Sequence, residues 1–435
     1  MAGPSLWLTT MGCAKNQVDS EKVAAMLSDV GYSWADSPER ADVVMVNTCA
    51  FVEEARAESV GAIVELGDRK QPEAKAVVIG CMAQRFGAEV SDALPEVDAV
   101  VGIDRYDELV PVLDGLTGRR PAQTAPPPVL DILHAPGRPA PGLPYAYLKA
   151  AEGCGKPCTF CAIPSIRGPL RSRPPADVRS EAEQLAAAGA VELVLVAQDL
   201  GAYGRDIDAL GGLVGLIGEL SDTPGLARLR LLYLHPREID DRLIEAMVAD
   251  PQVASYFDLS LQHVSRPLLR AMRRPGGAEE HLTLVDRIRG LDPAAAVRSS
   301  FIVGFPGESE AHVDELEEFL EEARLDWAGF FPYSAEPGTR AAGMADHPSP
   351  EDKAERARRL TSVQDEVTEA RNASLLGCHD RVIIDMVDDG APIGRSHRHA
   401  PEVDGIVRVD RGEPGEWVDI EYTGVYGPDM EGAAL

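Results

Sequence analysis

Three cysteines within eight residues constrain this chain more than any other feature of its sequence. They form the run Cys154-Gly-Lys-Pro-Cys158-Thr-Phe-Cys161, which follows a strand-like stretch at 145–149. A zinc ion would need a fourth protein ligand, and no histidine lies between residues 148 and 168. Three thiolates can instead hold three irons of a cubane cluster and leave the fourth iron open to a small molecule. A zinc loop and ordinary buried thiols are the alternatives, but the spacing favours the cluster.

The segments on both sides of this loop resemble the radical S-adenosylmethionine (SAM) superfamily. They are Leu148-Lys-Ala-Ala-Glu-Gly-Cys154 and Thr159-Phe-Cys-Ala-Ile-Pro-Ser-Ile-Arg-Gly168. Within that superfamily they are most similar to the methylthiotransferase family, RimO type. The resemblance implies that Cys154, Cys158 and Cys161 are the catalytic cysteines. They would hold a 4Fe–4S cluster whose open iron binds SAM and cleaves it reductively to a 5′-deoxyadenosyl radical.

A Rossmann-like α/β domain is predicted over residues 5–118. Continuous runs of Val, Ile and Leu are typical of buried parallel strands, and their alternation with helical patterns predicts a parallel sheet covered by helices. The first helix is expected after Asp19 and Ser20 as candidate caps, and the second over 51–66. The strand-like runs are 6–13, 41–49 and 76–81.

Each of these runs ends in a cysteine, at Cys13, Cys49 and Cys81. Ligands bind at the carboxyl ends of parallel strands, so we expect the three thiols to converge along one edge. Three cysteines at the same place in a repeating unit favour a second metal cluster over independent buried thiols, which are the alternative. The sequences around Cys13 and Cys49 resemble the amino-terminal methylthiotransferase domain. That resemblance implies that the three cysteines bind an auxiliary 4Fe–4S cluster that supplies sulfur.

A proline-rich connector is predicted over 119–139, and a central domain over 140–372. Eight prolines lie between residues 121 and 144, which is typical of an extended linker. Strand candidates alternate with helical segments in the central domain, and this pattern predicts a partial (βα) barrel of the radical SAM type, open on one side. Its site is expected at the carboxyl ends of the strands. The strand candidates are 145–149, 191–197, 229–234, 256–261, 297–303 and 327–333.

Polar residues and glycines at these strand ends are candidates for a SAM site. The family resemblance implies that Gln198, His263 and Gly304 lie where radical SAM enzymes hold the cofactor. For each histidine a satisfied structural role is equally compatible with the sequence, and the glycines can serve only to turn the chain. The remaining candidates at strand ends are Asp199, His235, Gln262 and Gly307.

Arg167, Arg171 and Arg173 are predicted to form a basic patch beside the cysteine loop. Two interpretations remain open at this point. The patch can bind a carboxylate or phosphate of a ligand, or it can pair with surface Asp and Glu side chains.

The C-terminal segment, 373–435, is predicted to form a small antiparallel β-barrel. Short alternating strands with Gly-rich turns indicate an OB-like fold, and their position and pattern resemble a TRAM domain. The segment has 13 Asp or Glu against 5 Arg and no Lys. Such a surface is poor for phosphate contacts, so we expect a basic protein partner rather than RNA. Cys378 stands alone beside a strand and is interpreted as structural.

Composition indicates a cytoplasmic protein without a membrane span. The 435 residues are 45% hydrophobic and carry a formal net charge of −29. No apolar run is long enough to span a bilayer, and no signal peptide is recognisable. Seven cysteines in a reducing compartment point to metal binding or catalysis. The acidic charge disfavours nonspecific nucleic-acid binding and would attract a basic partner.

The resemblance covers essentially the whole chain and implies a specific reaction. The expected enzyme uses SAM and two 4Fe–4S clusters to methylthiolate the β-carbon of an aspartate in the small-subunit ribosomal protein of the decoding centre. The expected partners are that basic protein or the ribosomal subunit, and a reductant such as flavodoxin or ferredoxin. A tRNA-adenosine methylthiotransferase of the MiaB type is the main alternative. A non-enzymatic electron carrier is a further alternative, but it would need four cysteines per cluster.

Overall fold

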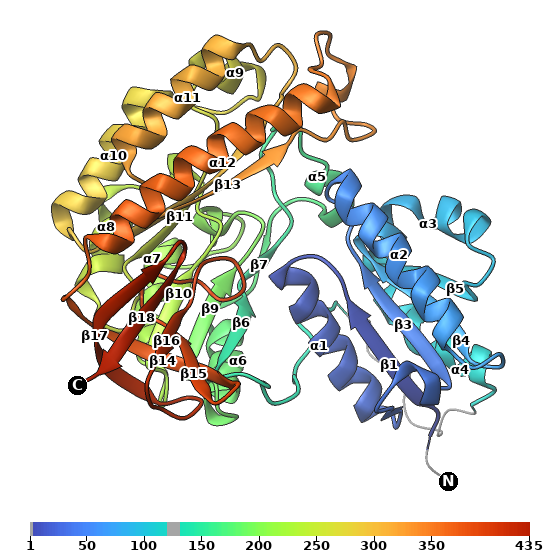
Figure 1. The fold of residues 1–435 in the computed structure, drawn as a ribbon. Helices are drawn as coiled ribbons and strands as arrows, with labels where there is room; N and C mark the ends of the chain where they lie inside the picture. Colours follow the sequence, from blue (N-terminus) through green and yellow to red (C-terminus); the bar gives the residue numbers. More distant parts are fainter. Residues whose placement is uncertain (1–2, 120–130) are drawn as a thin grey trace. The chain divides into compact units, whose positions relative to one another are not determined.

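The computed structural model describes residues 3–119 and 131–435. The chain forms two compact units, whose elements are labelled in Figure 1. The first unit contains Met1–Pro139, Ala151–Lys156 and Cys161–Arg173, and the second unit contains the remainder of the chain. The chain therefore passes from one unit to the other within the run of clustered cysteines.

A five-stranded parallel sheet forms the centre of the first unit, in the order β2-β1-β3-β4-β5. This confirms the predicted parallel sheet. Strands β1, β3 and β4 overlap the predicted runs, although β1 ends at Thr10, three residues before Cys13. Strands β2 and β5 were not expected, because strands this short carry little periodic signal. The strands are β1 (Ser5–Thr10), β2 (Ser33–Trp34), β3 (Val43–Thr48), β4 (Lys75–Gly80) and β5 (Ala99–Gly102).

Helices cover both faces of this sheet (Figure 1). One face packs against α1 and α4, where Leu27 and Leu113 are buried. The other face packs against α2 and α3, where Ile63 and Val90 are buried. The helices are α1 (Ala14–Asp29), α2 (Glu53–Arg69), α3 (Cys81–Ala93) and α4 (Leu109–Thr117), with short 3-10 turns η1 (Pro38–Arg40) and η2 (Ile103–Glu108).

Helix α1 begins at Ala14, so the predicted caps Asp19 and Ser20 are wrong. Both residues lie inside the helix and are buried. A Ser or Asp marks a helix start when its side chain bonds the local backbone. Here tertiary partners take both side chains: Asn47 Nδ2 donates to the Ser20 hydroxyl at 2.9 Å, and Asp19 pairs with Arg167 at 2.6 Å.

The predicted connector falls mainly on residues 120–130, which lie outside the described part of the chain. The residues that follow pack on the first unit. Ile132 and Ala135 are buried in the core that contains α1 and α4. Lys22 Nζ, also buried, donates to the carbonyl oxygen of Leu133 at 2.8 Å. This part of the predicted connector is thus a packed segment, which its proline content did not indicate.

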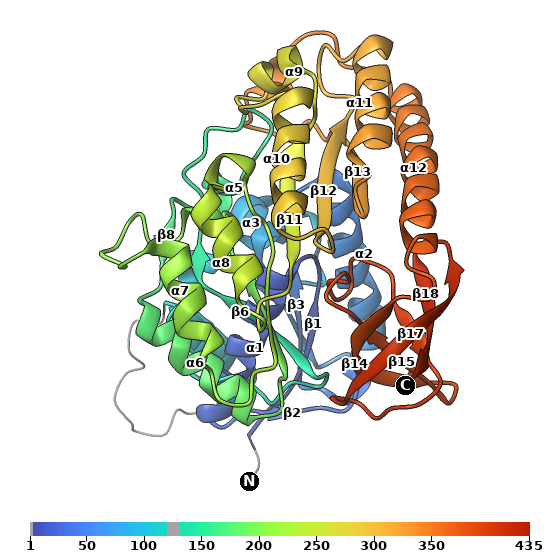
Figure 2. The same ribbon diagram turned by 90° about the vertical axis from the view of Figure 1, so that its left-hand side faces the viewer.

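Six parallel strands form the core of the second unit, and helices cover their outer side (Figure 2). The strands form two sheets, β6-β9-β10 and β11-β12-β13, which a bridge between Leu234 and Leu259 connects. The order leaves β6 and β13 at the edges of a partial barrel, as predicted. The strands are β6 (Tyr145–Lys149), β9 (Glu192–Val196), β10 (Arg228–Leu231), β11 (Tyr256–Gln262), β12 (Ala296–Val303) and β13 (Trp327–Pro332).

Helices α6 to α11 lie between successive strands of the partial barrel in the chain, and α12 follows its last strand, β13. Helices α10, α11 and α12 lie side by side (Figures 1 and 2). Within the ranges that the structure describes, each helix is too short or too polar to cross a membrane. The helices are α6 (Pro175–Ala187), α7 (Gly212–Ser221), α8 (Asp241–Ala249), α9 (Arg266–Ala271), α10 (Ala278–Leu291), α11 (Glu310–Ala323) and α12 (Pro350–Ala373).

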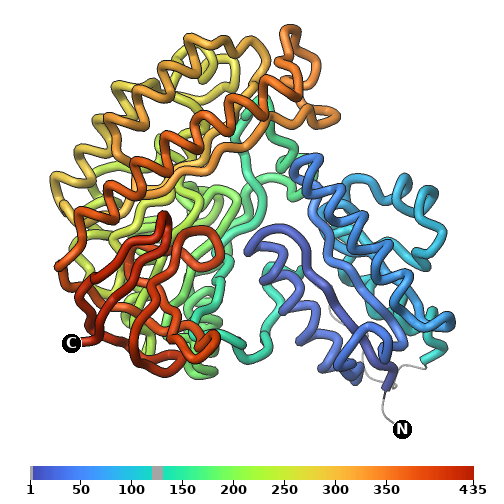
Figure 3. The backbone as a smooth tube through the Cα atoms, viewed as in Figure 1, coloured from blue at the N-terminus to red at the C-terminus, as the bar shows by residue number. Residues whose placement is uncertain are grey.

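Helix α12 leads directly into a closed five-stranded barrel (Figure 3). The strand order is β14-β15-β16-β18-β17, and every pair is antiparallel except β16–β18. Val382, Val407 and Ile420 are among the residues that fill its core. The predicted C-terminal barrel is therefore confirmed. Its strands are β14 (His379–Asp388), β15 (Ala391–Arg395), β16 (Val407–Val409), β17 (Trp417–Tyr426) and β18 (Asp429–Ala434).

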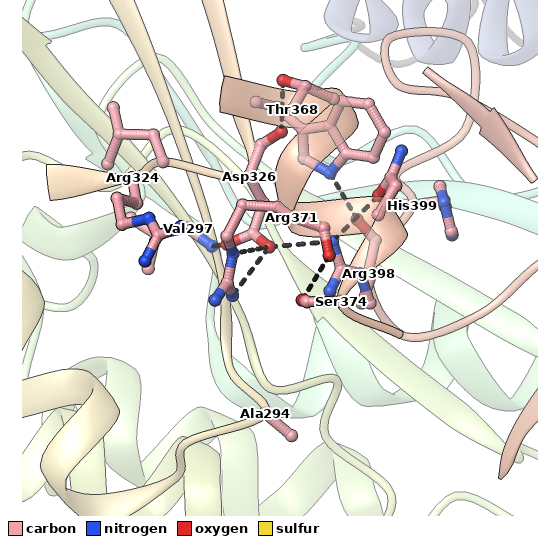
Figure 4. A network of polar contacts seen from close by, with 12 residues as sticks. Ala294, Val297, Arg324, Asp326, Thr368, Arg371, Ser374, Arg398 and His399 are labelled. Carbon is pink, nitrogen blue, oxygen red and sulfur yellow. Dashed lines mark hydrogen bonds and ion pairs between the residues drawn. The ribbon is translucent and has the colours of Figure 1, made fainter. Parts of the chain in front are cut away.

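A buried carboxylate joins this C-terminal barrel to the partial barrel (Figure 4). Asp326, which precedes β13, is fully buried and pairs with Arg398 from the C-terminal barrel at 2.9 Å. Arg371 of α12 and Arg289 of α10 pair with the same carboxylate at 3.0 and 3.2 Å. The three cations hold the pKa of Asp326 below its usual range, although burial alone would raise that pKa. The carboxylate is thus charged and shared by three elements.

A second buried carboxylate repeats this arrangement at the start of β9. Glu192 is fully buried and pairs with Arg230 of β10 at 2.7 Å and with Arg395 of β15 at 2.8 Å. Arg395 also pairs with Asp385 of β14 at 2.6 Å. Two independent ion-pair networks therefore hold the C-terminal barrel against the partial barrel.

The Asp326 network predicts a large effect on stability. Asp326→Asn is expected to lower the free energy of unfolding by about 3–5 kcal/mol, because it leaves buried guanidinium groups without their anion. Chemical denaturation followed by circular dichroism measures this loss.

Asp314→Asn is the matched control for this experiment. Asp314 pairs with Arg359 at 2.7 Å on the surface, where both side chains are at least one-third exposed. An exposed pair contributes about 0–1 kcal/mol. Equal losses in the two variants would show that the Asp326 network does not anchor the barrel.

Candidate functional site

The first group of cysteines lies at one edge of the parallel sheet. Cys49 and Cys81 directly follow β3 and β4, and Cys13 precedes α1 just beyond β1. The three strands are neighbours, with Thr10 opposite Asn47 and Thr48 opposite Gly80. Parallel pairing in this register brings the three thiols to the same end of the sheet.

Gly12 allows the ends of β1 and β3 to approach each other closely. Its φ of +93° lies in the left-handed region that glycine adopts without strain. A Cβ at this position would lie 2.7 Å from the Cβ and 2.9 Å from the sulfur of Cys49. Any larger residue would therefore displace the Cys49 thiol.

Asn16 connects all three strand ends from the first turn of α1. Its amide nitrogen donates to the carbonyl oxygens of Met11 and Thr48 at 2.9 and 3.0 Å. Its Oδ1 lies 3.5 Å from the sulfur of Cys81. The sequence analysis did not single out Asn16, because two of its partners, Thr48 and Cys81, are distant along the chain.

The protonation of these thiols depends on their burial. Burial raises the pKa of the Cys81 thiol to about 12, against the opposing charge of Arg167. Burial likewise raises the pKa of Cys49. At Cys13 burial acts in the same direction, but the charges of Lys15 and Arg167 outweigh it and lower the pKa. Metal binding would therefore have to displace the protons of Cys49 and Cys81 against the effect of burial.

No group of three His, Cys, Asp or Glu side chains among residues 3–119 and 131–435 is close enough to hold a single metal ion. A cluster of several irons binds each thiolate at a different corner, so its ligands lie farther apart than the ligands of one ion. Three thiols at one sheet edge are compatible with such a cluster.

The loop that carries the second cysteine group is closed at its base by a short hairpin. Strands β7 (Ala151–Glu152) and β8 (Arg171–Ser172) pair with each other. Gly153 has a φ of +76°, and a Cβ there would lie 2.1 Å from the Pro169 carbonyl oxygen. The N–H of Cys154 donates to the carbonyl of Gly168 at 3.1 Å. The ends of the cysteine loop are thus fixed by backbone contacts.

The three cysteines of this loop are half-buried. Cys154 and Cys161 belong to the first unit, and Cys158 belongs to the second. Backbone N–H groups of Lys156 and Ile163 lie 3.5 and 3.4 Å from the sulfurs of Cys154 and Cys161. Such donors stabilise thiolates, as a metal-binding loop requires.

Cys158 has its own donor within the second unit. Arg274 Nη1 lies 3.8 Å from the Cys158 sulfur. The next residue, Thr159, is held by Met272, whose carbonyl accepts from the Thr159 N–H at 3.1 Å. The guanidinium places positive charge beside a sulfur that would bind iron.

The predicted basic patch is wrong. Arg167 and Arg173 are buried, and only Arg171 lies on the surface. Arg171 pairs with Asp131. Arg167, at the end of α5 (Ile163–Arg167), pairs with buried carboxylates of its own unit. Both Arg167 and Arg171 therefore pair with carboxylates, as the second interpretation stated. Arg171 does so on the surface, whereas Arg167 does so inside the protein.

Glu308 connects two of the predicted SAM-site residues in the second unit. The N–H of Gly304 donates to Glu308 Oε1 at 2.8 Å, and His263 Nε2 lies 3.5 Å from Glu308 Oε2. Arg356 of α12 pairs with the same carboxylate at 3.2 Å. The sequence analysis did not include Glu308, although it follows the Gly304-Phe-Pro-Gly turn directly.

The tautomer of His263 is fixed by its backbone contacts. Its Nδ1 accepts from the N–H groups of Val264 and Ser265, both at 2.9 Å. The ring proton of the neutral form therefore sits on Nε2, which faces Glu308. His235 has a local role instead, because its Nδ1 accepts from the Arg237 N–H at 3.2 Å and caps a 3-10 turn.

Gly304 and Gln198 lie at the ends of strands in different sheets of the partial barrel. Gly304 has a φ of +75°, and a Cβ there would lie 2.3 Å from the Cγ atom of Lys353. The lack of a side chain at Gly304 is thus explained by packing against Lys353. Gln198 is half-buried beyond the end of β9, in the neighbouring sheet of the partial barrel.

Two non-glycine residues at the strand ends have left-handed backbone conformations. Tyr233 has a φ of 64° beyond the end of β10, and Gln262 has a φ of 73° at the end of β11. Strain of this kind is concentrated at functional sites. Its position agrees with a site at the carboxyl ends of these strands.

The chain matches three sequence families along its length. Residues 5–102 match Uncharacterized protein family UPF0004, residues 148–320 match the Radical SAM superfamily, and residues 376–435 match the TRAM domain.

Curated relatives are similar over nearly the whole chain. The ribosomal protein uS12 methylthiotransferase RimO of Streptomyces coelicolor is 41% identical, over 97% of this chain and 95% of its own length. The protein of the same name from Salinispora arenicola is 40% identical, over 98% of this chain and 95% of its own length.

Among solved structures, the radical S-adenosylmethionine methyltransferase TsrM of Kitasatospora setae has a similar fold. The structure, which holds cobalamin and a 4Fe–4S cluster, aligns with a TM-score of 0.55 at 17% identity. The alignment covers 78% of this chain and 77% of that protein. At this identity the comparison concerns the fold alone.

The close approach at Gly12 gives a direct test of the first cysteine group. If these three thiols hold iron, Gly12→Ala is expected to lose most of it, because its Cβ would overlap the Cys49 side chain and its φ would be strained. Iron content after anaerobic reconstitution measures this loss. The parent should be the full chain in which the three cysteines of the CxxxCxxC loop are changed to alanine.

Gly61→Ala in α2 is the matched control. A Cβ at Gly61 meets nothing within 4 Å, and alanine favours a helix by about 0.5–1 kcal/mol over glycine. This variant should keep its iron. Full iron content in Gly12→Ala would contradict the interpretation that Cys13, Cys49 and Cys81 hold iron in this arrangement.

Proposed function

We propose that this chain, which belongs to the RimO family of radical SAM methylthiotransferases, adds a methylthio group to ribosomal protein uS12. The observation that carries this proposal is the 40% identity to curated uS12 methylthiotransferases over 98% of this chain. The family match of residues 148–320 to the Radical SAM superfamily supports the same reaction class. The proposed acceptor is the β-carbon of an aspartate of uS12.

Two groups of residues would hold the inorganic cofactors. Cys154, Cys158 and Cys161 would hold one 4Fe–4S cluster, and the three cysteines at the sheet edge would hold a second. When bound, the first cluster and SAM supply a radical that removes hydrogen from an unactivated carbon, and the second cluster supplies sulfur. The protein contributes the donors near these sulfurs, including Arg274 beside Cys158.

Gln198, His263 and Gly304 are proposed to lie around SAM. In this part of the second unit, Glu308 would position the strand ends, because it accepts from the Gly304 N–H and faces His263. Arg356 keeps this buried carboxylate paired. The Nε2 of His263 lies 3.5 Å from the Glu308 carboxylate, so the two residues can hold the β11 and β12 ends in one arrangement.

The surface of the C-terminal barrel supports a protein substrate. Seven of its acidic residues are exposed, against three exposed arginines. The other two arginines are buried in the networks of Glu192 and Asp326. A surface of this charge attracts a basic protein and gives few contacts to phosphates. The proposed electron donor is a flavodoxin or ferredoxin.

The two cysteine groups should have separable roles. Cys154→Ala is expected to abolish SAM cleavage, because it removes a ligand of the cluster that reduces SAM. Cys81→Ala is expected to keep SAM cleavage but to lose methylthio transfer. Formation of 5′-deoxyadenosine and modification of a uS12 peptide, measured in the same anaerobic reaction, distinguish these outcomes.

Cys378→Ala is the control, because Cys378 is exposed and belongs to neither group. It should retain both activities. Loss of SAM cleavage in a well-folded Cys81→Ala protein would show that this division of roles is wrong.

The substrate is tested by mass spectrometry of uS12 and of tRNA nucleosides from cells with and without this chain. A methylthio mass gain on an aspartate of uS12, with tRNA unchanged, is expected. A gain on tRNA adenosine alone would overturn the proposed substrate and favour the MiaB-type reaction. No gain on either would also overturn it.

A further inference from the structure

A buried arginine connects the two cysteine-bearing segments within the first unit. Arg167 is 6% exposed and stands six residues after Cys161 in the chain. Its Nη1 contacts Asp19 at 2.6 Å and Glu152 at 3.2 Å. Its Nη2 donates to the sulfur of Cys81 at 3.2 Å.

The two nitrogens of this guanidinium have different partners. The carboxylates of Asp19 and Glu152 hold Nη1, and both are buried. The Nη2 atom is left for the Oδ1 of Asn16, at 2.5 Å, and for the sulfur of Cys81. Only arginine offers several N–H donors in a rigid planar fork. A lysine cannot make both sets of contacts in this geometry.

The surroundings explain why this cation is held in place. Asp19 lies in α1, and Glu152 lies in β7, next to the base of the CxxxCxxC loop. The side chain of Arg167 therefore ties the start of that loop to the sheet edge where Cys81 emerges. Its positive charge is paired with two carboxylates, so its remaining N–H donors can serve a sulfur ligand while the guanidinium stays paired.

We propose that Arg167 is a positioning residue that donates a hydrogen bond to the Cys81 sulfur when Cys81 binds the auxiliary cluster, and that it thereby raises the reduction potential of that cluster. This inference rests on the proposed second cluster. The potential of an iron–sulfur cluster depends on its net charge and on hydrogen bonds to its sulfurs. A cation and an N–H donor at a ligand sulfur both favour the state with the extra electron.

The test uses the full chain with Cys154, Cys158 and Cys161 changed to alanine, so that only the auxiliary cluster is present. A redox titration monitored by EPR gives its midpoint potential. Arg167→Gln is expected to lower the ratio of reduced to oxidised cluster about tenfold at fixed potential, which is 59 mV for a one-electron couple. Glu152→Gln is expected to shift the ratio in the opposite direction, because it removes a negative charge.

Three further comparisons make this test specific. Arg167→Lys keeps the positive charge but loses the planar set of N–H donors. The midpoint potential should therefore change less in this variant than in Arg167→Gln. Arg171→Lys is the matched control, because Arg171 lies on the surface of the same segment and pairs with Asp131. Its potential should equal that of the parent. In protein with isotope-labelled arginine, pulsed EPR should detect a nitrogen coupling that Arg167→Gln abolishes.

A double variant keeps the experiment decisive if Arg167→Gln does not fold. Arg167→Gln with Glu152→Gln removes one positive and one negative charge, so the net buried charge is unchanged. Its potential should be lower than that of Glu152→Gln alone, because only the guanidinium differs between the two.

The outcomes separate this inference from the proposed function. If the parent without the loop cysteines binds no iron, the proposed second cluster fails and this inference fails with it. If the parent binds a cluster whose potential does not change in Arg167→Gln or in the double variant, the second cluster stands and the role of Arg167 is overturned.

Discussion

A guanidinium that is buried away from water must be paired with carboxylates, and much of this structure depends on that requirement. Leaving a buried charge unpaired costs about 3–5 kcal/mol. Arg167 pairs with Asp19, which is 148 residues away in the sequence, and with Glu152 at the base of the cysteine loop. Arg398 of the C-terminal barrel pairs with Asp326, which precedes β13 of the partial barrel. Each pair forms only when distant segments are in their native places, so these pairs select one arrangement of each unit as well as stabilising it.

The elements that the sequence predicts well are those whose signal is local. Buried parallel strands appear as continuous aliphatic runs, and β6 has the bounds predicted for it. The cysteines at the sheet edge could be predicted to converge, because register and strand order follow from the α/β pattern. The two-residue strand β2 could not be found, since it contains too few residues to show any periodicity.

The errors concern polar side chains whose partners are distant along the chain. Asp19 resembles a helix cap, and Arg167 resembles part of a surface patch, when each is considered alone. Together they form a buried pair at 2.6 Å. Asn16 and Glu308 were missed for the same reason, because Asn16 contacts Thr48, and Glu308 contacts His263 and Arg356, all distant along the chain. A sequence shows the donors and acceptors of a site, but only the fold decides which of them meet.

The acidic surface of the C-terminal barrel follows from the same pairing rule. A barrel of this size can bind RNA when its arginines face outward, where they reach phosphates. Arg395 and Arg398 face inward and pair with Glu192 and Asp326. Releasing them to a ligand would remove a cation from each of these buried carboxylates and break the networks that hold the barrel. The packing of this barrel against the partial barrel thus leaves an excess of carboxylates outside. A basic protein surface is complementary to that excess. The ion pairs that hold the second unit together therefore also favour a protein over a nucleic acid as the binding partner of this surface.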